Sequence, residues 1–195
     1  MGTFNSIEEA REFFINDKFA TNAGVQLDEL NDEYCQCSLE LNDGHKNAVG
    51  GVMGGVIFTL ADFAFAALSN QLHSPTVAQQ VSVNYLSAPK GEKLIAKAVC
   101  KKNGRSSSII NVDIVDDAGR DIVQFIGTGL KAVTIGNKLT SIGNAAFYNC
   151  DGFTSVVLPN TVTSIGNYAF QDCSNLETVT FSNKLESIGD YAFSE

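Results

Sequence analysis

The spacing of apolar residues predicts two different helices and a strand in the first third of the chain. Residues 55–69, GVIFTLADFAFAALS, are apolar around nearly the whole helical circumference, which predicts a buried helix. Residues 6–19 instead mix apolar and charged positions, with Ser6 and Glu9 at the spacing of a capping box, and predict a surface helix. Residues 34–41 alternate between apolar and polar, as in a half-buried strand.

Four more stretches carry the alternation or β-branched content of strands. They are residues 76–86, 92–103, 107–117 and 121–132. Turn-forming residues at 89–91, 103–104 and 117–119 separate them, which favours an antiparallel meander. Residues 1–132 are therefore predicted to form one α+β domain, in which an antiparallel sheet wraps around a buried helix.

The C-terminal third of the chain repeats with a period of 23 residues. The repeating positions are Ile142, Ile165 and Ile188, each followed by glycine; Phe147, Phe170 and Phe193; Cys150 and Cys173; and strand-like triplets at 133–135, 156–158 and 179–181. A repeat of this length is too short to bury its own apolar side chains, so neighbouring repeats must cover them. The pattern predicts a short solenoid over residues 133–195, joined to the first domain without a linker.

The repeated segments LTSIGNAAFYNC and VTSIGNYAFQDC resemble the BspA-like leucine-rich repeats. The resemblance covers residues 133–195 and includes two complete repeats and a third that reaches Glu195 before its cysteine position. We expect the third repeat to leave an apolar end that attracts other apolar surface. The expected cover is an identical end from another chain, that is, self-association through the repeats.

Composition narrows the possible partners of the 195-residue chain. Hydrophobic residues make up 44%, enough for a substantial core, and 22 acids against 13 bases give a net charge of −9. This acidity speaks against nucleic acid as a partner, because phosphate binding needs a basic surface. No apolar run reaches about 18 residues without a charge, so no membrane partner is expected.

Cysteine and histidine usage argues against a metal centre. The five cysteines are sparse, and no secretory signal precedes them, which predicts reduced thiols in a cytoplasmic protein. His45 and His73 are the only histidines, and neither lies at metal-ligand spacing from a cysteine or another histidine. We therefore expect neither a metal nor a cofactor.

Asp62 is the first candidate for chemistry. Between Lys46 and Lys90 it is the only acid or base other than His73, and it lies in the middle of the predicted buried helix. A carboxylate there costs free energy unless it is hydrogen-bonded or functional. A polar contact with neighbouring backbone is the structural alternative.

A glycine-rich segment, residues 47–55, leads into that helix. The free N–H groups at a helix N-terminus, together with the helix dipole, suit an anionic oxygen. The alternative is that the glycines only allow a tight turn against the sheet.

Together these residues resemble the phenylacetate-degradation (PaaI-like) hotdog-fold thioesterases. The motif is Asn47-x-x-Gly50-x-x-Met53-Gly54-Gly55 followed by Thr59-Leu60-Ala61-Asp62, with later matches at Val83-Asn84-Tyr85-Leu86, Pro89, Gly104-Arg105 and Gly127-Thr128-Gly129. The resemblance covers roughly residues 5–132. It implies hydrolysis of acyl-CoA thioesters in an active site that two subunits share, with CoA as part of the substrate and no separate cofactor.

The resemblance also implies roles for individual residues. Asp62 would be the nucleophile or the general base that activates water, and Gly54, with Gly55, would donate backbone N–H groups to the thioester carbonyl oxygen. Asn47 would orient the substrate or the water. Met53 stands where the family usually has histidine, and methionine lacks a strong hydrogen-bond donor. This departure leaves open a non-catalytic hotdog protein that binds acyl-CoA.

Helix geometry predicts an oligomer independently of the motif. Gly54 and Asp62 are eight residues apart, which corresponds to about 12 Å along a helix. One thioester carbon does not easily reach both, so the N–H donor and the carboxylate should come from different chains. The active unit should then be at least a homodimer, and a tetramer is equally compatible.

A basic stretch offers contacts for the CoA phosphates. Residues 1–45 contain 10 acids and 2 bases, whereas residues 90–105 contain 6 bases and 1 acid. Arg105 is the first candidate for a phosphate contact because its guanidinium matches phosphate geometry, and Lys90 is another. The alternative is a strand edge that lysines protect from aggregation. A third functional hypothesis is an interaction protein in which the leucine-rich repeats do the binding and the hotdog domain is a dimeric platform.

Overall fold

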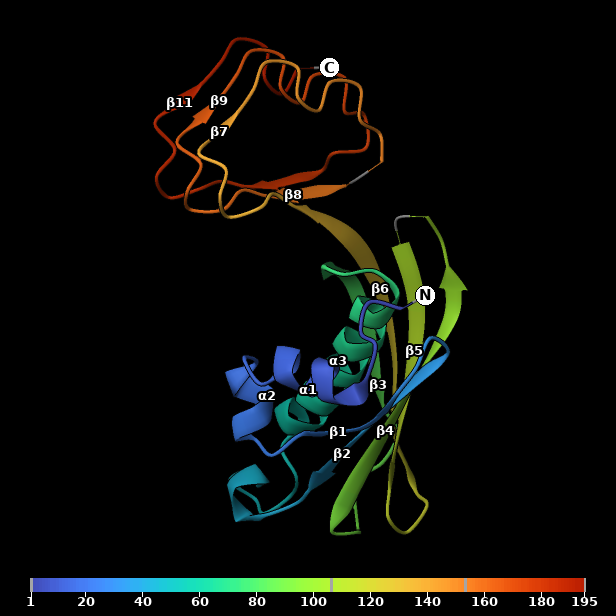
Figure 1. The fold of residues 1–195 in the computed structure, drawn as a ribbon. Coiled ribbons are helices and arrows are strands. Elements are labelled where there is room, and N and C mark those ends of the chain that lie inside the picture. The colour runs from blue at the N-terminus through green and yellow to red at the C-terminus, as the bar shows by residue number, and fades with distance from the viewer. Residues whose placement is uncertain (1, 106, 153, 195) are drawn as a thin grey trace. The chain divides into compact units, whose positions relative to one another are not determined.

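A computed structural model of the chain describes residues 2–105, 107–152 and 154–194 (Figure 1). It divides into two compact units, residues 1–129 and 130–195. The domain boundary predicted after residue 132 falls within strand β6 (Asp121–Thr134), and it stays a prediction.

The first unit contains a long helix, two short helices and six strands. Its elements are α1 (Ile7–Phe14), α2 (Lys18–Asn22), β1 (Gln26–Leu30), β2 (Tyr34–Glu40), the 3-10 turn η1 (Asp43–His45), α3 (Gly54–Leu72), β3 (Thr76–Tyr85), β4 (Lys93–Asn103), β5 (Ser107–Asp116) and β6. The sheet order is β1-β2-β4-β5-β6, and β3 also pairs with β6. The pairs β1–β2, β2–β4 and β4–β5 are antiparallel.

The predicted meander is correct for β4, β5 and β6 but wrong for β3. Strand β3 lies beside β6 rather than beside β4, the next strand in sequence. The connection from Leu86 to Glu92 contains Pro89 and is too long for a tight hairpin, so the chain crosses over before β4 begins. Strand β1 was not predicted, and it continues the sheet beyond β2.

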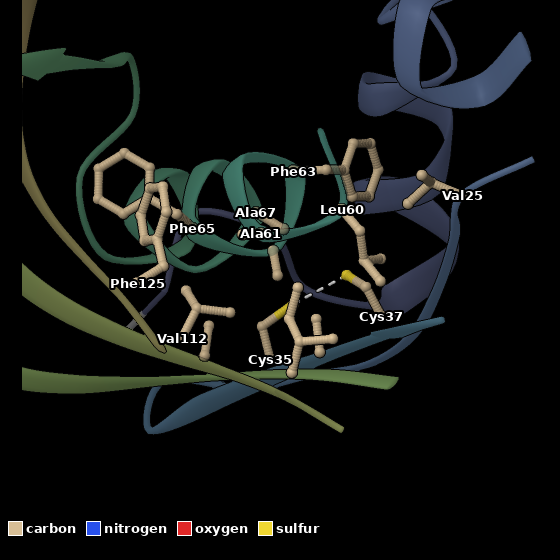
Figure 2. Close-up of a cluster of buried hydrophobic side chains, with 14 of the residues drawn as sticks. Val25, Cys35, Cys37, Leu60, Ala61, Phe63, Phe65, Ala67, Val112 and Phe125 are labelled. Atoms are coloured by element: carbon tan, nitrogen blue, oxygen red, sulfur yellow. Dashed lines mark hydrogen bonds between the residues drawn. The ribbon is translucent and has the colours of Figure 1, made fainter. Parts of the chain in front are cut away.

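The core of the first unit forms where α3 packs against β2, β4 and β5. Figure 2 shows Leu60, Ala61 and Phe65 of α3 among side chains of the sheet, including Val112 and Phe125. Leu60, Ala61, Val112 and Phe125 are completely buried. The predicted fold, an antiparallel sheet around a central helix, is confirmed.

Helix α3 begins within one residue of its predicted start, whereas the surface helix predicted over 6–19 is wrong as one element. Asp17 interrupts it: its side chain accepts a hydrogen bond from the N–H of Ala20 and caps a separate helix, α2. At the first end Ser6 caps Glu9 as predicted, but the Glu9 carboxylate accepts from Asn5 rather than from Ser6. The capping box is therefore half formed.

Among the described residues, α3 alone is long and apolar enough to span a membrane by length and composition. Of its most apolar 18-residue window, 67% is buried inside the protein. A core helix passes the same test, so the length of α3 is weak evidence for a span.

The second unit is a stack of 23-residue repeats. Its strands are β7 (Ser141–Ile142), β8 (Ser155–Val157), β9 (Ser164–Ile165), β10 (Thr178–Thr180) and β11 (Ser187–Ile188). The end of β6 pairs in parallel with β8, and β8 with β10, while β7, β9 and β11 form a second parallel ladder. Every pair in both ladders joins residues 23 apart. The ladders are those expected of stacked leucine-rich repeats, although the second one was not predicted.

Side chains of the second unit stack with the same period. The rings of Phe147, Phe170 and Phe193 lie parallel, with centroids 4.9 and 5.1 Å apart. The side-chain oxygen of Asn144 accepts from the N–H of Asn167, and that of Asn167 from the N–H of Asp190. Each repeat thus binds the next through both an apolar and a polar column.

Candidate active site

Asp62 lies midway along α3 as a half-buried carboxylate. Burial, and secondarily the negative charge of Asp17, raise the pKa of Asp62 above its ordinary value. The Asp62 carboxylate accepts no hydrogen bond from the described residues. A carboxylate with a raised pKa is better suited to accept a proton near neutral pH, and its free oxygens leave room for a water molecule.

The N-terminus of α3 presents unused backbone donors. Gly54 and Gly55 occupy the first turn, where N–H groups have no intrahelical acceptor, and neither N–H bonds to any described residue. Met53 caps the helix in an extended conformation without a side-chain hydrogen bond. The predicted glycine-rich approach to a helix N-terminus is confirmed as a structure, and its role in oxyanion binding stays a prediction.

Asn47 shapes the loop that precedes this helix. Its side-chain oxygen accepts hydrogen bonds from the N–H groups of Val49 and Gly51, at 3.0 and 3.1 Å. Gly50 completes the turn with a φ of 82°, a left-handed conformation that favours glycine. The oxygen of Asn47 is therefore occupied, and only its amide N–H groups remain for the predicted contact with substrate or water.

Tyr85 is a contact that the sequence did not reveal. It was noted only as part of a family pattern, yet its hydroxyl donates to the carbonyl of Gly54 at 3.0 Å. A Cβ atom placed on Gly54 would lie 3.5–3.6 Å from the ring and hydroxyl of Tyr85, which is ordinary van der Waals contact. The end of β3 thereby fixes the first turn of α3. Only the three-dimensional placement of β3 could show this, because the two residues are 31 positions apart.

A pocket of about 460 Å³ opens beside the first two turns of α3. Its walls come from α2, η1 and α3, and include Lys18, Phe19, His45, Met53, Gly55 and Thr59. The terminal methyl group of Met53 lies close to Gly55, so the pocket wall is apolar at the position where the family pattern has histidine. Gly55, Thr59 and Asp62 are spaced by four and three residues, which places them on one face of α3.

His45 is buried and structural rather than chemical. Its Nε2 lies 2.9 Å from the carbonyl oxygen of Ala23, and its Nδ1 accepts from the N–H of Asn42. It therefore ties η1 to the end of α2. No group of three or more potential metal ligands occurs among the described residues.

The predicted phosphate contacts do not lie together. Lys90 precedes β4 and Arg105 follows it, so the length of an 11-residue strand, on the order of 30 Å, separates them. Lys93 is paired with Glu40, and Lys97 lies over the ring of Tyr34. The bases without an ion-pair partner among the described residues include Lys101, Lys102 and Arg105, which surround the β4–β5 hairpin.

Two family profiles match different parts of the chain. The Thioesterase superfamily matches residues 49–123, which contain α3 and the strands from β3 to the start of β6. The BspA type leucine-rich repeat region matches residues 123–195. Both predicted resemblances are confirmed.

Curated relatives resemble the first unit. A protein of Archaeoglobus fulgidus named "Putative esterase" is 30% identical over 124 residues, or 63% of this chain and 80% of that protein. The acyl-coenzyme A thioesterase PaaI of Escherichia coli is 24% identical over 134 residues, or 68% of this chain and 94% of PaaI.

Solved structures share the fold of the first unit. The E. coli PaaI structure covers 67% of this chain and 93% of its own, with a TM-score of 0.61 and 22% identity, and so supports the fold alone. A hypothetical thioesterase from Streptococcus pneumoniae, solved with coenzyme A, is 26% identical, covers 60% of this chain and 94% of its own, and has a TM-score of 0.56.

Proposed function

Because the chain belongs to the thioesterase superfamily, we propose that it hydrolyses acyl-CoA thioesters to a free acid and CoA. The observation that carries the proposal is Asp62, a half-buried carboxylate with a raised pKa and no hydrogen-bond partner among the described residues. The name of the E. coli relative and the coenzyme A in the S. pneumoniae structure support acyl-CoA as the substrate class.

In the proposed reaction the Asp62 carboxylate takes a proton from water while the water oxygen bonds to the thioester carbonyl carbon. The electron pair of the C=O π bond moves to oxygen, where the N–H groups of Gly54 and Gly55 stabilise the negative charge. When the C=O bond re-forms, the C–S bond breaks and its electron pair leaves with the CoA sulfur. The protonated Asp62 returns its proton to that thiolate.

We further propose that the donor glycines and the carboxylate of each site come from two protomers. Their separation of about 12 Å along α3 supports this arrangement. Strand β3 also supports a homodimer: eight of its ten residues are exposed, including Val77, Val81 and Tyr85, and it pairs with β6 alone among the described strands. A long exposed edge strand that carries apolar side chains needs a cover, and a second copy would supply one.

Mixed dimers test the shared site. One chain carries Asp62→Asn and the other Gly54→Pro, which removes the N–H of Gly54. Proline suits the first position of a helix, and the extended Met53 has the backbone that precedes proline, so the helix should persist. Each homodimer should be inactive, whereas mixed dimers should regain activity because one of their two sites has both groups. Well-folded mixed dimers that stay inactive would place the site within one chain.

Release of the CoA thiol from a panel of arylacetyl, short-chain and long-chain acyl-CoAs tests the activity itself. Turnover of at least one thioester, lost in Asp62→Asn, is the expected result. Binding of acyl-CoA without turnover would instead favour the non-catalytic acyl-CoA-binding protein, to which Met53 points.

The basic residues of the β4–β5 hairpin are the proposed contacts for the CoA phosphates. Arg105→Gln should raise the KM for acyl-CoA with little change in kcat, because it removes binding that ground state and transition state share. Lys90→Gln, at the other end of β4, is the matched comparison and should have the smaller effect.

A further inference from the structure

The repeat stack has two different ends. The tail face is the exposed side of the third repeat and consists of Glu186, Ile188, Asp190, Tyr191 and Phe193. The head face is the opposite side of the first repeat and consists of Thr140, Gly143, Asn144 and Ala146. Strand β11 is the edge of its ladder at the tail face, and β7 is the edge at the head face.

Hydrogen bonds between neighbouring repeats follow a fixed rule. The N–H groups of Tyr168 and Phe170 donate forward to carbonyls of the third repeat, Asp190 and Ala192. In the other direction, Glu186 and Gly189 donate back to carbonyls of the second repeat, Thr163 and Ile165. The first and second repeats are joined by the equivalent bonds, 23 residues earlier.

The same rule leaves complementary groups at the two ends. On the tail face the N–H groups of Tyr191 and Phe193, and the carbonyls of Glu186 and Ile188, have no partner among the described residues. On the head face the equivalent unpaired groups are the carbonyls of Asn144 and Ala146 and the N–H groups of Thr140 and Gly143. Each donor of one face thus corresponds to an acceptor of the other at the repeat spacing.

The column of side chains at Asn144, Asn167 and Asp190 also makes the tail face complementary to the head face. The Asn144 and Asn167 oxygens each accept from the backbone N–H of the next repeat. The carboxylate of Asp190 has no such donor, and the N–H of Asn144 has no such acceptor, among the described residues. A second tail face would bring another carboxylate to Asp190, whereas a head face brings the missing N–H.

Glycine recurs every 23 residues at Gly143, Gly166 and Gly189, and the space around it differs between the first repeat and the others. A Cβ on Gly166 would lie 2.4 Å from the Asn144 side-chain oxygen, and one on Gly189 equally close to that of Asn167. The preceding repeat therefore requires glycine at these positions. At Gly143 nothing lies within 4 Å, so this chain alone does not require a glycine there.

We propose that the tail face of one copy of this chain binds the head face of a second copy. The first repeat of the second copy would continue the 23-residue register, with its Gly143 against Asp190 and its Phe147 against Phe193. The apolar part of the contact is available, because Ile188, Tyr191 and Phe193 are 50%, 65% and 37% exposed. A head-to-tail contact of this kind is heterologous, so it produces rings or open filaments rather than a closed pair.

Gly143→Ala tests the proposal with a single methyl group. The fold should tolerate it, because the space is empty and the φ of Gly143 is not positive. In the contact, however, the methyl would meet the Asp190 of the other copy, and overpacking of that kind should weaken association at least about tenfold. Gly136→Ala is the matched control, since its space is also empty while the equivalent positions in the other repeats are Pro159 and Ser182.

Sedimentation velocity of the full chain over a range of concentrations provides the measurement. The sedimentation coefficients of the parent and of Gly136→Ala should rise with concentration beyond the value for the oligomer of the first unit. Those of Gly143→Ala and Phe193→Asp should not. A small amount of Gly143→Ala mixed with the parent should shorten the assemblies, because it binds through its tail face only. All variants should hydrolyse acyl-CoA at the parent rate.

Three results would overturn the proposal. If assembly with rising concentration is abolished by Phe193→Asp but not by Gly143→Ala, the contact joins two tail faces. Growth that neither variant affects, or no growth of the parent at the highest soluble concentration, would show that the faces do not bind each other.

Discussion

The two units pair their polar groups in different ways. In the repeats one solution recurs every 23 residues, so that Asn144, Asn167 and Asp190 form a single column. In the first unit each solution is unique: the buried Gln71 side chain bonds both to the backbone of Phe4 and to Asp32. The half-buried carboxylate of Asp62 has no hydrogen bond among the described residues and follows neither pattern. The comparison teaches that the bonding rule between repeats is left incomplete at the two ends of the stack, whereas the first unit leaves a half-buried carboxylate unpaired within its central helix, where chemistry is possible. Buried hydroxyls without a partner among the described residues occur in both units, at Ser108, Thr154 and Ser155.

The largest expected effect separates the half-buried carboxylate of Asp62 from an exposed carboxylate. Asp62→Asn keeps the volume of the side chain and removes the base, so kcat should fall by about 10²–10⁴-fold. Asp113→Asn, on an exposed position of β5, is the matched control and should keep parental activity. CoA-thiol release measures both, and near-parental turnover in Asp62→Asn would contradict the catalytic role.

The same variant should raise stability at neutral pH. Burial raises the pKa of Asp62, so the folded state binds more protons than the unfolded state between the ordinary and the raised pKa. Stability is therefore lost as the pH rises through that window, and Asp62→Asn avoids the loss. We expect a higher Tm than the parent at pH 7, with the difference disappearing below about pH 3.

Core truncations test whether the two units are energetically separate. Phe125→Ala in the first unit and Phe170→Ala in the second should each cost about 3–5 kcal/mol, because both rings are buried. Phe125→Ala should reduce hydrolysis at elevated temperature, whereas Phe170→Ala should leave it unchanged. Calorimetry combined with activity after heating provides the measurement. Equal loss of activity in both variants would show that the units unfold together.

A smaller effect is expected where β3 holds the helix N-terminus. Tyr85→Phe removes the hydroxyl that donates to Gly54 and keeps the ring, so kcat should fall about two- to tenfold with little change in KM. Tyr34→Phe also removes one hydrogen-bonded hydroxyl, in this case from the start of β2, and should leave kcat unchanged. A rise in KM alone would assign Tyr85 to substrate binding instead.

The smallest effect concerns the charge near Asp62. Asp17 contributes to the raised pKa of Asp62, so Asp17→Asn should lower that pKa. Asparagine also caps helices well, so α2 should remain. The acidic limb of the kcat/KM profile should move to lower pH by about a few tenths of a unit. A shift to higher pH would mean that Asp17 does not act on Asp62 through its charge.

The central helix and the repeats could be predicted because their patterns are local and long. A 15-residue segment that is apolar nearly all round, with Asp62 in its middle, indicated α3, and five columns in register indicated the stack. The position of β3 could not be predicted, since the order of strands in a sheet depends on long-range pairing rather than on the turn that follows. The break at Asp17 was missed because helical spacing continues across it while the side chain forms a competing cap.

The candidate site was predictable in its residue types and less so in its geometry. Asp62 and Gly54 could be identified from charge isolation and glycine spacing. The occupied oxygen of Asn47, the contact of Tyr85 with Gly54 and the separation of Lys90 from Arg105 depend on loop closure and strand direction. Those are properties of the folded chain, which no spacing in the sequence encodes.

Strand β6 has a consequence for the order in which the chain folds. A stack of repeats pays its greatest entropic cost for the first pairing, after which each new strand adds to an existing edge. Here the last residues of β6, Ala132–Thr134, already form the rung on which β8 pairs. Because β6 begins in the first unit, we expect folding of that unit to hold the strand that leads into this rung in an extended conformation. The stack should therefore refold faster attached to residues 1–129 than as a free segment.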